Sequence, residues 1–339
     1  MSLLPFLSSK LSLLPRLISP TTTALSPSPS PLPLHIRLRL LLLQPLNVLA
    51  ALLISPYWLL STRYTVTYIP TRHGSCRCLI FLPRGARQGL APLHIDVHGG
   101  GWVGGFAEQD ARWCGVLSDR AGAVVVSVGY RIAPAHIYPA AHDDVADILT
   151  YLIAHARDFG ADATLLTVGG SSVGGGLALC AAQTQVPLAY VGFCPALDFR
   201  VSPGEKSKPV GFPRTDPLKC LLPLFDVYAG EERAKHLEDA KLHPILAGKD
   251  VVPRDVLVVG AEIDVLLAEQ VDFVKRLKRE VGDESERRIE IVIVEGAFHG
   301  FMELPSFILE KERVEIFERS IAFIKEAHKK AGYEIDKKR

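Results

Sequence analysis

Residues 164–174, TLLTVGGSSVG, decide the fold, because an apolar strand-like run leads directly into a serine that stands between two glycines. Gly170 and Gly174 lie two residues before and two residues after Ser172, which is the spacing of a nucleophile elbow between a strand and a helix. Small residues at these positions keep such a strained turn free of clashes. An ordinary Gly/Ser-rich loop is the equal alternative for so short a motif, so the surrounding chain has to decide.

A second glycine run, His98-Gly99-Gly100-Gly101-Trp102, follows the third strand-like segment. Acyl transfer develops negative charge on an oxygen, and converging backbone N–H groups stabilise that charge. We expect the N–H groups of Gly100 and Gly101, together with that of Val173 after the candidate nucleophile, to form such an oxyanion hole. His98 is expected to hold the loop by hydrogen bonds rather than to transfer protons.

Other interpretations of these glycines fit less well. A flexible turn is the simplest of them, and Gly99, Gly101 and Gly104 also match the GxGxxG spacing of a dinucleotide-binding turn. That turn opens the first βαβ unit of its fold, whereas this run follows a third strand. The elbow is not a phosphate-binding loop, because Gly175 stands where that motif needs lysine. The sequence therefore predicts no cofactor and no metal site.

A serine hydroxyl needs a base to activate it, and the base needs a carboxylate to orient it. Asp264 follows the seventh strand-like segment and His299 follows the eighth, so the order is serine, acid, histidine. Among the eleven histidines, His299 alone combines a position after a strand with flanking glycine turns. Glu262 is the rival acid, but Asp264 is favoured because it falls in the loop. The predicted catalytic residues are Ser172, Asp264 and His299.

Eight short β-rich segments are predicted, at 64–70, 76–82, 92–98, 123–129, 164–169, 187–194, 255–260 and 288–295. Helices are predicted at about 110–121, 140–156, 173–182, 266–281 and 306–330. Strands and helices alternate from the third strand onward, which indicates an α/β fold with an eight-stranded, mostly parallel sheet covered on both faces. Chemistry gathers at the carboxyl ends of the strands in such a sheet.

The N-terminal part has a different composition. Residues 1–39 are Ser/Pro-rich and are predicted to be disordered. Residues 40–62 are predicted to form an apolar helix long enough to cross a bilayer, although Gln44, Pro45, Asn47 and Pro56 would make it a poor span. The alternatives are a cap helix lying on the catalytic domain and the tail of a mitochondrial-type presequence. Residues 63–339 are the predicted catalytic domain, with a helical cap inserted at about 198–254.

Length, charge and cysteine usage narrow the class of protein. The 339 residues are 48% hydrophobic, which suffices for one large core. Nine of the 38 Lys and Arg residues precede Asp96 and no acid does, so the rest of the chain is net acidic. No basic face of the kind that a nucleic-acid binder needs is indicated. The six cysteines lack the spacing of a zinc site or of a disulfide framework.

Taken together, these motifs resemble the hormone-sensitive-lipase-like branch of the α/β-hydrolases, from about Tyr64 to the C-terminal helix. The matching residues are 98–102, Tyr130-Arg131-Ile132-Ala133-Pro134 with Pro139-Ala140, Asp143-Asp144, 170–175, Asp264 and His299. The resemblance implies an α/β-hydrolase fold with a helical cap and a carboxylesterase-type activity through a Ser172-His299-Asp264 triad. Arylacetamide deacetylases, which an N-terminal apolar segment anchors to the membrane, belong to this branch and are similar.

The sequence departs from the family pattern close to the nucleophile. Ser171 stands where the family commonly has Asp, and Val173 stands where it commonly has Ala. Ala135 and Gly176 replace a usual Glu and a frequent Asn. None of these changes removes a member of the predicted triad, so we expect them to affect substrate preference and rate.

The expected function is cleavage of hydrophobic esters with short to medium acyl groups through an acyl-enzyme on Ser172. An amide or natural-product deacetylase is an alternative, and so is a non-catalytic binding protein on the same fold, which the presence of His299 disfavours. The expected partner is a small hydrophobic ester. Membrane association through the apolar segment is weighed against its role in the cap, and an endoplasmic-reticulum-type membrane, the cytoplasm and the mitochondrion stay open as compartments, as does the oligomeric state.

Overall fold

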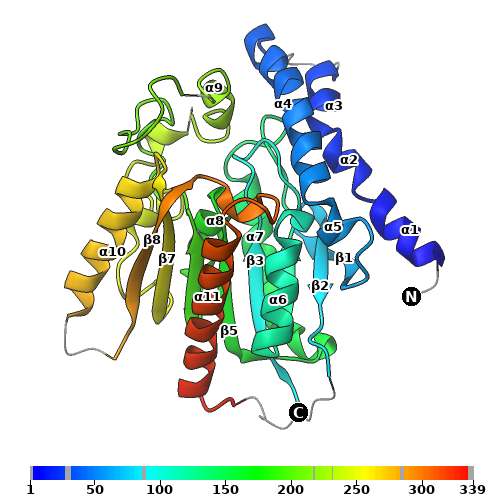
Figure 1. Ribbon diagram of the computed structural model, residues 1–339, viewed down its shortest axis with the longest axis vertical. Helices are drawn as coiled ribbons and strands as arrows, with labels where there is room; N and C mark the ends of the chain where they lie inside the picture. The colour runs from blue at the N-terminus through cyan, green and yellow to red at the C-terminus, as the bar shows by residue number, and fades with distance from the viewer. Residues whose placement is uncertain are drawn as a thin grey trace.

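One eight-stranded sheet organises the chain in the order β1-β2-β4-β3-β5-β6-β7-β8 (Figure 1). The computed structural model describes residues 3–26, 32–85, 89–216, 218–230, 232–282 and 286–334. The strands are β1 Tyr64–Thr71, β2 Gly74–Phe81, β3 Ala91–Val97, β4 Val124–Val128, β5 Ala161–Ser171, β6 Ala189–Phe193, β7 Asp255–Ile263 and β8 Ile289–Phe298. Each predicted strand falls on one of them.

The sheet is mostly parallel, as predicted. Only β2 is antiparallel to its neighbours β1 and β4, and the pairs from β4 through β3 to β8 are parallel. Parallel pairing places the carboxyl ends of β3, β5, β7 and β8 at one edge of the sheet. The glycine run, the elbow serine, the acid and the histidine follow these four strands, so the topology alone brings the predicted site residues to the same edge.

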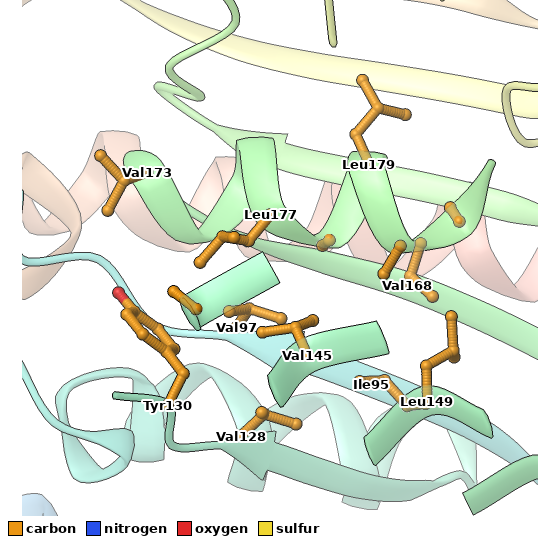
Figure 2. Packing of buried hydrophobic residues seen from close by; sticks show 14 of the residues in the cluster. Ile95, Val97, Val128, Tyr130, Val145, Leu149, Val168, Val173, Leu177 and Leu179 are labelled. Carbon is orange, nitrogen blue, oxygen red and sulfur yellow. The ribbon is translucent and has the colours of Figure 1, made fainter. Parts of the chain in front are cut away.

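Helices cover both faces of the sheet. α7 (Ala140–Ala154), α8 (Val173–Ala182) and α10 (Leu267–Val281) pack with one hydrophobic cluster, and α6 (Ala111–Ala121) and α11 (Glu310–Lys330) pack with the other. Figure 2 shows Val145 of α7 and Leu177 of α8 beside Val97 of β3 in the first cluster. This packing fixes α8, and with it the turn that carries Ser172.

The N-terminal part differs from its predicted disorder, and this expectation is corrected. α1 (Leu3–Leu11), α2 (Leu14–Leu17) and α3 (Ser19–Leu25) precede a longer helix, α4 (Leu34–Leu53), and the short α5 (Ser55–Trp58). Leu13 and Ala24 are each 1% exposed, because they bury against clusters that the catalytic domain supplies. The composition of residues 1–39 correctly indicates that they cannot build a hydrophobic core of their own. Their helices are ordered because they pack against the core of the catalytic domain. The Ser-Pro repeat at 27–31 lies outside the described residues.

The predicted insertion between β6 and β7 is present, but turns dominate it. Its described part holds one short α-helix, α9 (Leu222–Phe225), and 3₁₀ turns at Arg233–Lys235 and Pro244–Leu246. α4 packs against α9, and Arg39 Nε donates to Cys220 O over 2.8 Å. The cap is therefore built in space from the insertion together with the N-terminal helices. α4 is also the one described helix that is long and apolar enough to cross a membrane.

Candidate active site

The elbow is a sharp turn between β5 and α8. Ser172 has φ 52° and ψ −127°, a conformation that non-glycine residues rarely adopt. Its N–H donates to Phe193 O over 2.8 Å. A Cβ atom on Gly170 or on Gly174 would lie 2.3 Å or 2.1 Å from Val97 O, so no larger residue fits at either position. The glycine spacing that predicted the elbow is thus a packing requirement against β3.

Three predicted side chains form a hydrogen-bonded chain. Ser172 Oγ lies 2.9 Å from His299 Nε2, and His299 Nδ1 lies 2.8 Å from Asp264 Oδ2. The other Asp264 oxygen accepts the N–H of Leu266 over 2.9 Å, which fixes the carboxylate. The rival acid, Glu262, accepts the N–H of Gly296 over 2.7 Å instead. The structure thus brings together the three residues that the sequence singled out.

The electrostatics of the chain couple the acid to the histidine. Burial alone would lower the pKa of His299, but the hydrogen-bonded Asp264 carboxylate more than offsets it, and the net pKa is raised. Burial works in the opposite direction on Asp264, whose pKa is nonetheless held below its usual value by His299 and by the Leu266 N–H. The carboxylate therefore stays ionised and stabilises positive charge on the imidazole.

The glycine run lies against the elbow. A Cβ atom on Gly99 would be 3.2 Å from Ser172 Cβ, so the loop backbone runs directly beside the serine. Gly100 has φ +118° and Gly101 has φ +60°, which favour glycine. A Cβ atom on Gly101 would lie 2.7 Å from the Phe225 ring of the cap. This loop can therefore approach a substrate with bare backbone, which an oxyanion hole requires.

His98 sits beneath this loop rather than in the reacting set. Its Nδ1 lies 2.6 Å from Gly99 O, and its ring stacks on Tyr130 with centroids 4.4 Å apart. The Tyr130 hydroxyl donates to His98 O over 2.9 Å. Burial lowers the pKa of His98 to about 3, so the ring is neutral near pH 7. These contacts agree with the loop-holding role expected from the sequence.

Ser171, beside the nucleophile, connects the glycine loop to a buried acid. The N–H of Gly99 donates to Ser171 Oγ, and the Ser171 hydroxyl donates to Asp110 Oδ2, each over 3.0 Å. Ser171 is 3% exposed, so its hydroxyl is committed on both sides. Burial raises the pKa of Asp110 and of its neighbour Asp96, whose charge raises the pKa of Asp110 further.

Aromatic residues clamp the cap onto the loop. Trp102, the last residue of the glycine run, has φ 69° and stacks on Tyr228 with ring centroids 4.0 Å apart. The Tyr228 hydroxyl accepts the N–H of Ala141 over 3.1 Å and lies 2.9 Å from His142 Nδ1. The cap is therefore fixed to both the loop and the start of α7.

Sequence reasoning missed two groups beside the triad, Cys194 and Glu303. Cys194, at the carboxyl end of β6, offers Sγ within 4.8 Å of donor atoms of Asp264 and His299. Within the described part of the chain, Cys194, Asp264 and His299 form the one cluster of side chains whose donor atoms lie close enough together to bind a metal ion. Asp264 and His299 are already hydrogen-bonded to each other. Glu303, four residues after His299, contributes to the raised pKa of that histidine. Only their proximity to strand ends could have signalled them.

Comparisons with known proteins agree with this fold. Residues 94–303 match the model of an alpha/beta hydrolase fold family, Abhydrolase_3. The chain is 29% identical over 243 residues to an ethyl acetate hydrolase of Pseudomonas putida, which covers 67% of this chain and 70% of that protein. A hyperthermophilic esterase of the archaeon Pyrobaculum calidifontis superposes with a TM-score of 0.71 at 27% identity, over 85% of this chain and 93% of that one. EstE1, a thermostable carboxylesterase from a metagenomic library, superposes with a TM-score of 0.71 at 25% identity, over 85% and 97%.

The sheet order and the hydrogen-bonded serine, histidine and aspartate define a hydrolase of the α/β class. The chain belongs to the alpha/beta hydrolase fold family, in its hormone-sensitive-lipase-like branch. It is a carboxylic ester hydrolase of the carboxylesterase type, as the sequence predicted.

Proposed function

We propose that this hydrolase cleaves hydrophobic esters with short to medium acyl groups by way of an acyl-enzyme on Ser172. Ser172 Oγ attacks the ester carbonyl carbon while His299 Nε2 takes its proton. The tetrahedral oxyanion is held by the N–H groups of Gly100, Gly101 and Val173. As the C–O bond to the alcohol breaks, His299 returns the proton to the leaving oxygen. Water then attacks the acyl-enzyme through the same base, which releases the acid and restores Ser172.

The observation that carries the proposal is the continuous chain from Ser172 Oγ to His299 to Asp264, with contacts of 2.9 Å and 2.8 Å. The serine of this hydrogen-bonded chain lies on a strained turn, directly beside the glycine backbone of the loop 98–102. A nucleophile, a base and an orienting acid within hydrogen-bond reach are the geometric requirement for acyl transfer.

The proposed preference for modest acyl groups rests on the walls around the serine. Val173 directly follows the nucleophile, and we expect its branched Cβ to narrow the space there. The Phe225 ring approaches Gly101 so closely that a methyl group would not fit. The similar Pseudomonas putida protein is named for hydrolysis of ethyl acetate, a short ester.

A series of p-nitrophenyl esters from acetate to palmitate tests this proposal. We expect kcat/KM to be highest for the acetyl to octanoyl members and to fall for longer chains, and we expect Ser172→Ala to abolish turnover throughout the series. A maximum at the longest chains would contradict the proposed acyl size. Full turnover by Ser172→Ala would contradict the mechanism itself.

A further inference from the structure

Helix α4 turns an apolar face outward. Nine of its large aliphatic side chains are exposed, including Leu34 at 70%, Leu38 at 57% and Leu52 at 62%. The nine are Leu34, Leu38, Leu41, Leu42, Leu46, Val48, Leu49, Leu52 and Leu53. A turn of 3.6 residues places them, with Pro45, on one continuous side of the helix. Water-facing helix surfaces in soluble proteins are polar, so this face calls for an apolar contact.

The opposite side of α4 faces the hydrolase, and it carries both apolar and amide side chains. Ile36, Leu40 and Ala51 are buried there together with Asn47. Asn47 Nδ2 and Gln44 Nε2 each donate to Leu17 O of α2 over 2.9 Å. The Asn47 side-chain oxygen also borders Gly104, next to the glycine run. The two amide side chains of α4 therefore face inward among apolar residues, while the outward side is mainly aliphatic.

The charges around this face are of one sign. No Asp or Glu occurs before Asp96, so the N-terminal helices carry basic side chains alone. Helical spacing puts Arg37 at one border of the apolar face and Arg39 at the other. Arg37 Nε donates to Ala24 O and Arg39 to Cys220 O and His35 O, and neither pairs with a carboxylate within the described residues. An aliphatic strip between two uncompensated cations is complementary to acyl chains beneath anionic headgroups.

We propose that the outward face of α4 docks on the surface of a lipid bilayer that carries anionic headgroups, with the helix lying in the interface. The axis of α4 stays on the hydrolase, because crossing the bilayer would break the Gln44 and Asn47 contacts that attach it to α2. A second copy of the chain is a poorer occupant. Protein–protein contact surfaces favour Tyr, Trp, Met and Arg at their centres, whereas this face consists of Leu, Val and Pro together with the exposed His35.

Docking on this face would bring the cap to the membrane. α4 also contacts α9, and Leu43 borders Gly104 beside the glycine run. The inference goes beyond the proposed chemistry and does not depend on it, because none of the outward leucines contacts the triad. A Ser172→Ala variant is therefore expected to bind vesicles as the parent does.

Flotation of the full-length protein with vesicles tests the docking surface. The probes are vesicles of phosphatidylcholine alone and vesicles with about 30% phosphatidylserine. We expect flotation with the anionic vesicles and release by alkaline carbonate. The triple variant Leu38→Glu, Leu42→Glu, Leu49→Glu should lower the bound fraction by about tenfold or more, because three charges would enter the acyl region. Its hydrolysis of soluble p-nitrophenyl acetate should stay at the parent level.

The matched control places the same three charges on apolar residues exposed elsewhere, Val210→Glu, Leu237→Glu and Phe307→Glu, and should float as the parent does. Equal loss in this control would overturn the assignment to α4, and so would a parent protein that fails to float. Resistance to carbonate extraction would show a span instead. A dimer in light scattering that only the α4 triple variant dissociates would show that a second copy occupies the face.

Discussion

At the scale of single residues, the site depends on a serine held in an unfavourable conformation. A positive φ at a residue with a Cβ atom costs about 1–3 kcal/mol, and such strain persists where the surroundings enforce it. Here the Phe193 carbonyl binds the Ser172 N–H, and Gly170 and Gly174 pack against Val97 O. The strain lifts Oγ out of the sheet edge toward His299.

Ser171 is expected to act as a positioning residue for the glycine loop. Ser171→Ala removes the link between the Gly99 N–H and Asp110, so the loop donors lose their alignment in the transition state. We predict that kcat falls about tenfold with little change in KM, since one hydrogen bond contributes about 1 kcal/mol. Steady-state kinetics measures this split. A variant with unchanged kcat would show that the link does not position the loop.

The pairing of His299 with Asp264 predicts a pH effect with a definite sign. The base must be neutral to accept a proton, so the acid limb of the kcat/KM profile follows the pKa of His299. Asp264 raises that pKa. Asp264→Asn should therefore move the limb to lower pH, while turnover falls by about ten-thousandfold because the ring loses its orienting partner.

Glu262→Gln is the control for that profile. In the parent protein, the Glu262 carboxylate accepts a hydrogen bond from the Gly296 N–H rather than from His299. We expect the position of the acid limb and the turnover of this variant to match the parent. A shift in Glu262→Gln but not in Asp264→Asn would reverse the assignment of the acid.

At the scale of elements, the cap is held by aromatic contacts rather than by long helices. Tyr228 stacks on Trp102 and binds the start of α7 through its hydroxyl. Tyr228→Phe keeps the ring stack but leaves the Ala141 N–H without its partner. We predict a loss of about 1–3 kcal/mol in the free energy of unfolding, measured in urea. Tyr68→Phe, at an exposed tyrosine on β1, should change it far less, and equal losses would contradict the clamp.

The elements also show which patterns a sequence reveals. Strands β1 to β8 could be located because their alternating or continuous apolar runs end in Gly and Pro turns. The helices α1 to α3 could not, because Leu13 and Ala24 bury in clusters that consist mostly of residues far along the chain. The cap was expected to be helical, but its Pro-rich sequence folds mainly into turns.

At the scale of the whole molecule, the order of motifs along the chain predicted the site because the sheet is parallel. Each of Gly99, Ser172, Asp264 and His299 follows a strand whose carboxyl end reaches the same edge. Residues that meet only through side-chain packing gave no such signal. Asp110 ends a 3₁₀ turn, and nothing in its local sequence marks it as a neighbour of the elbow. Cys194 directly follows β6, and only that position at a strand end could have marked it.

The most direct measurement of the central proposal is the site of covalent labelling by a fluorophosphonate, mapped by mass spectrometry of the digested protein. The account predicts one adduct, on Ser172, that accompanies complete loss of ester hydrolysis and is absent in Ser172→Ala. The same adduct on Ser172 should also form in the Ser171→Ala variant. An adduct on Ser171, or full hydrolysis that survives labelling of Ser172, would contradict the account.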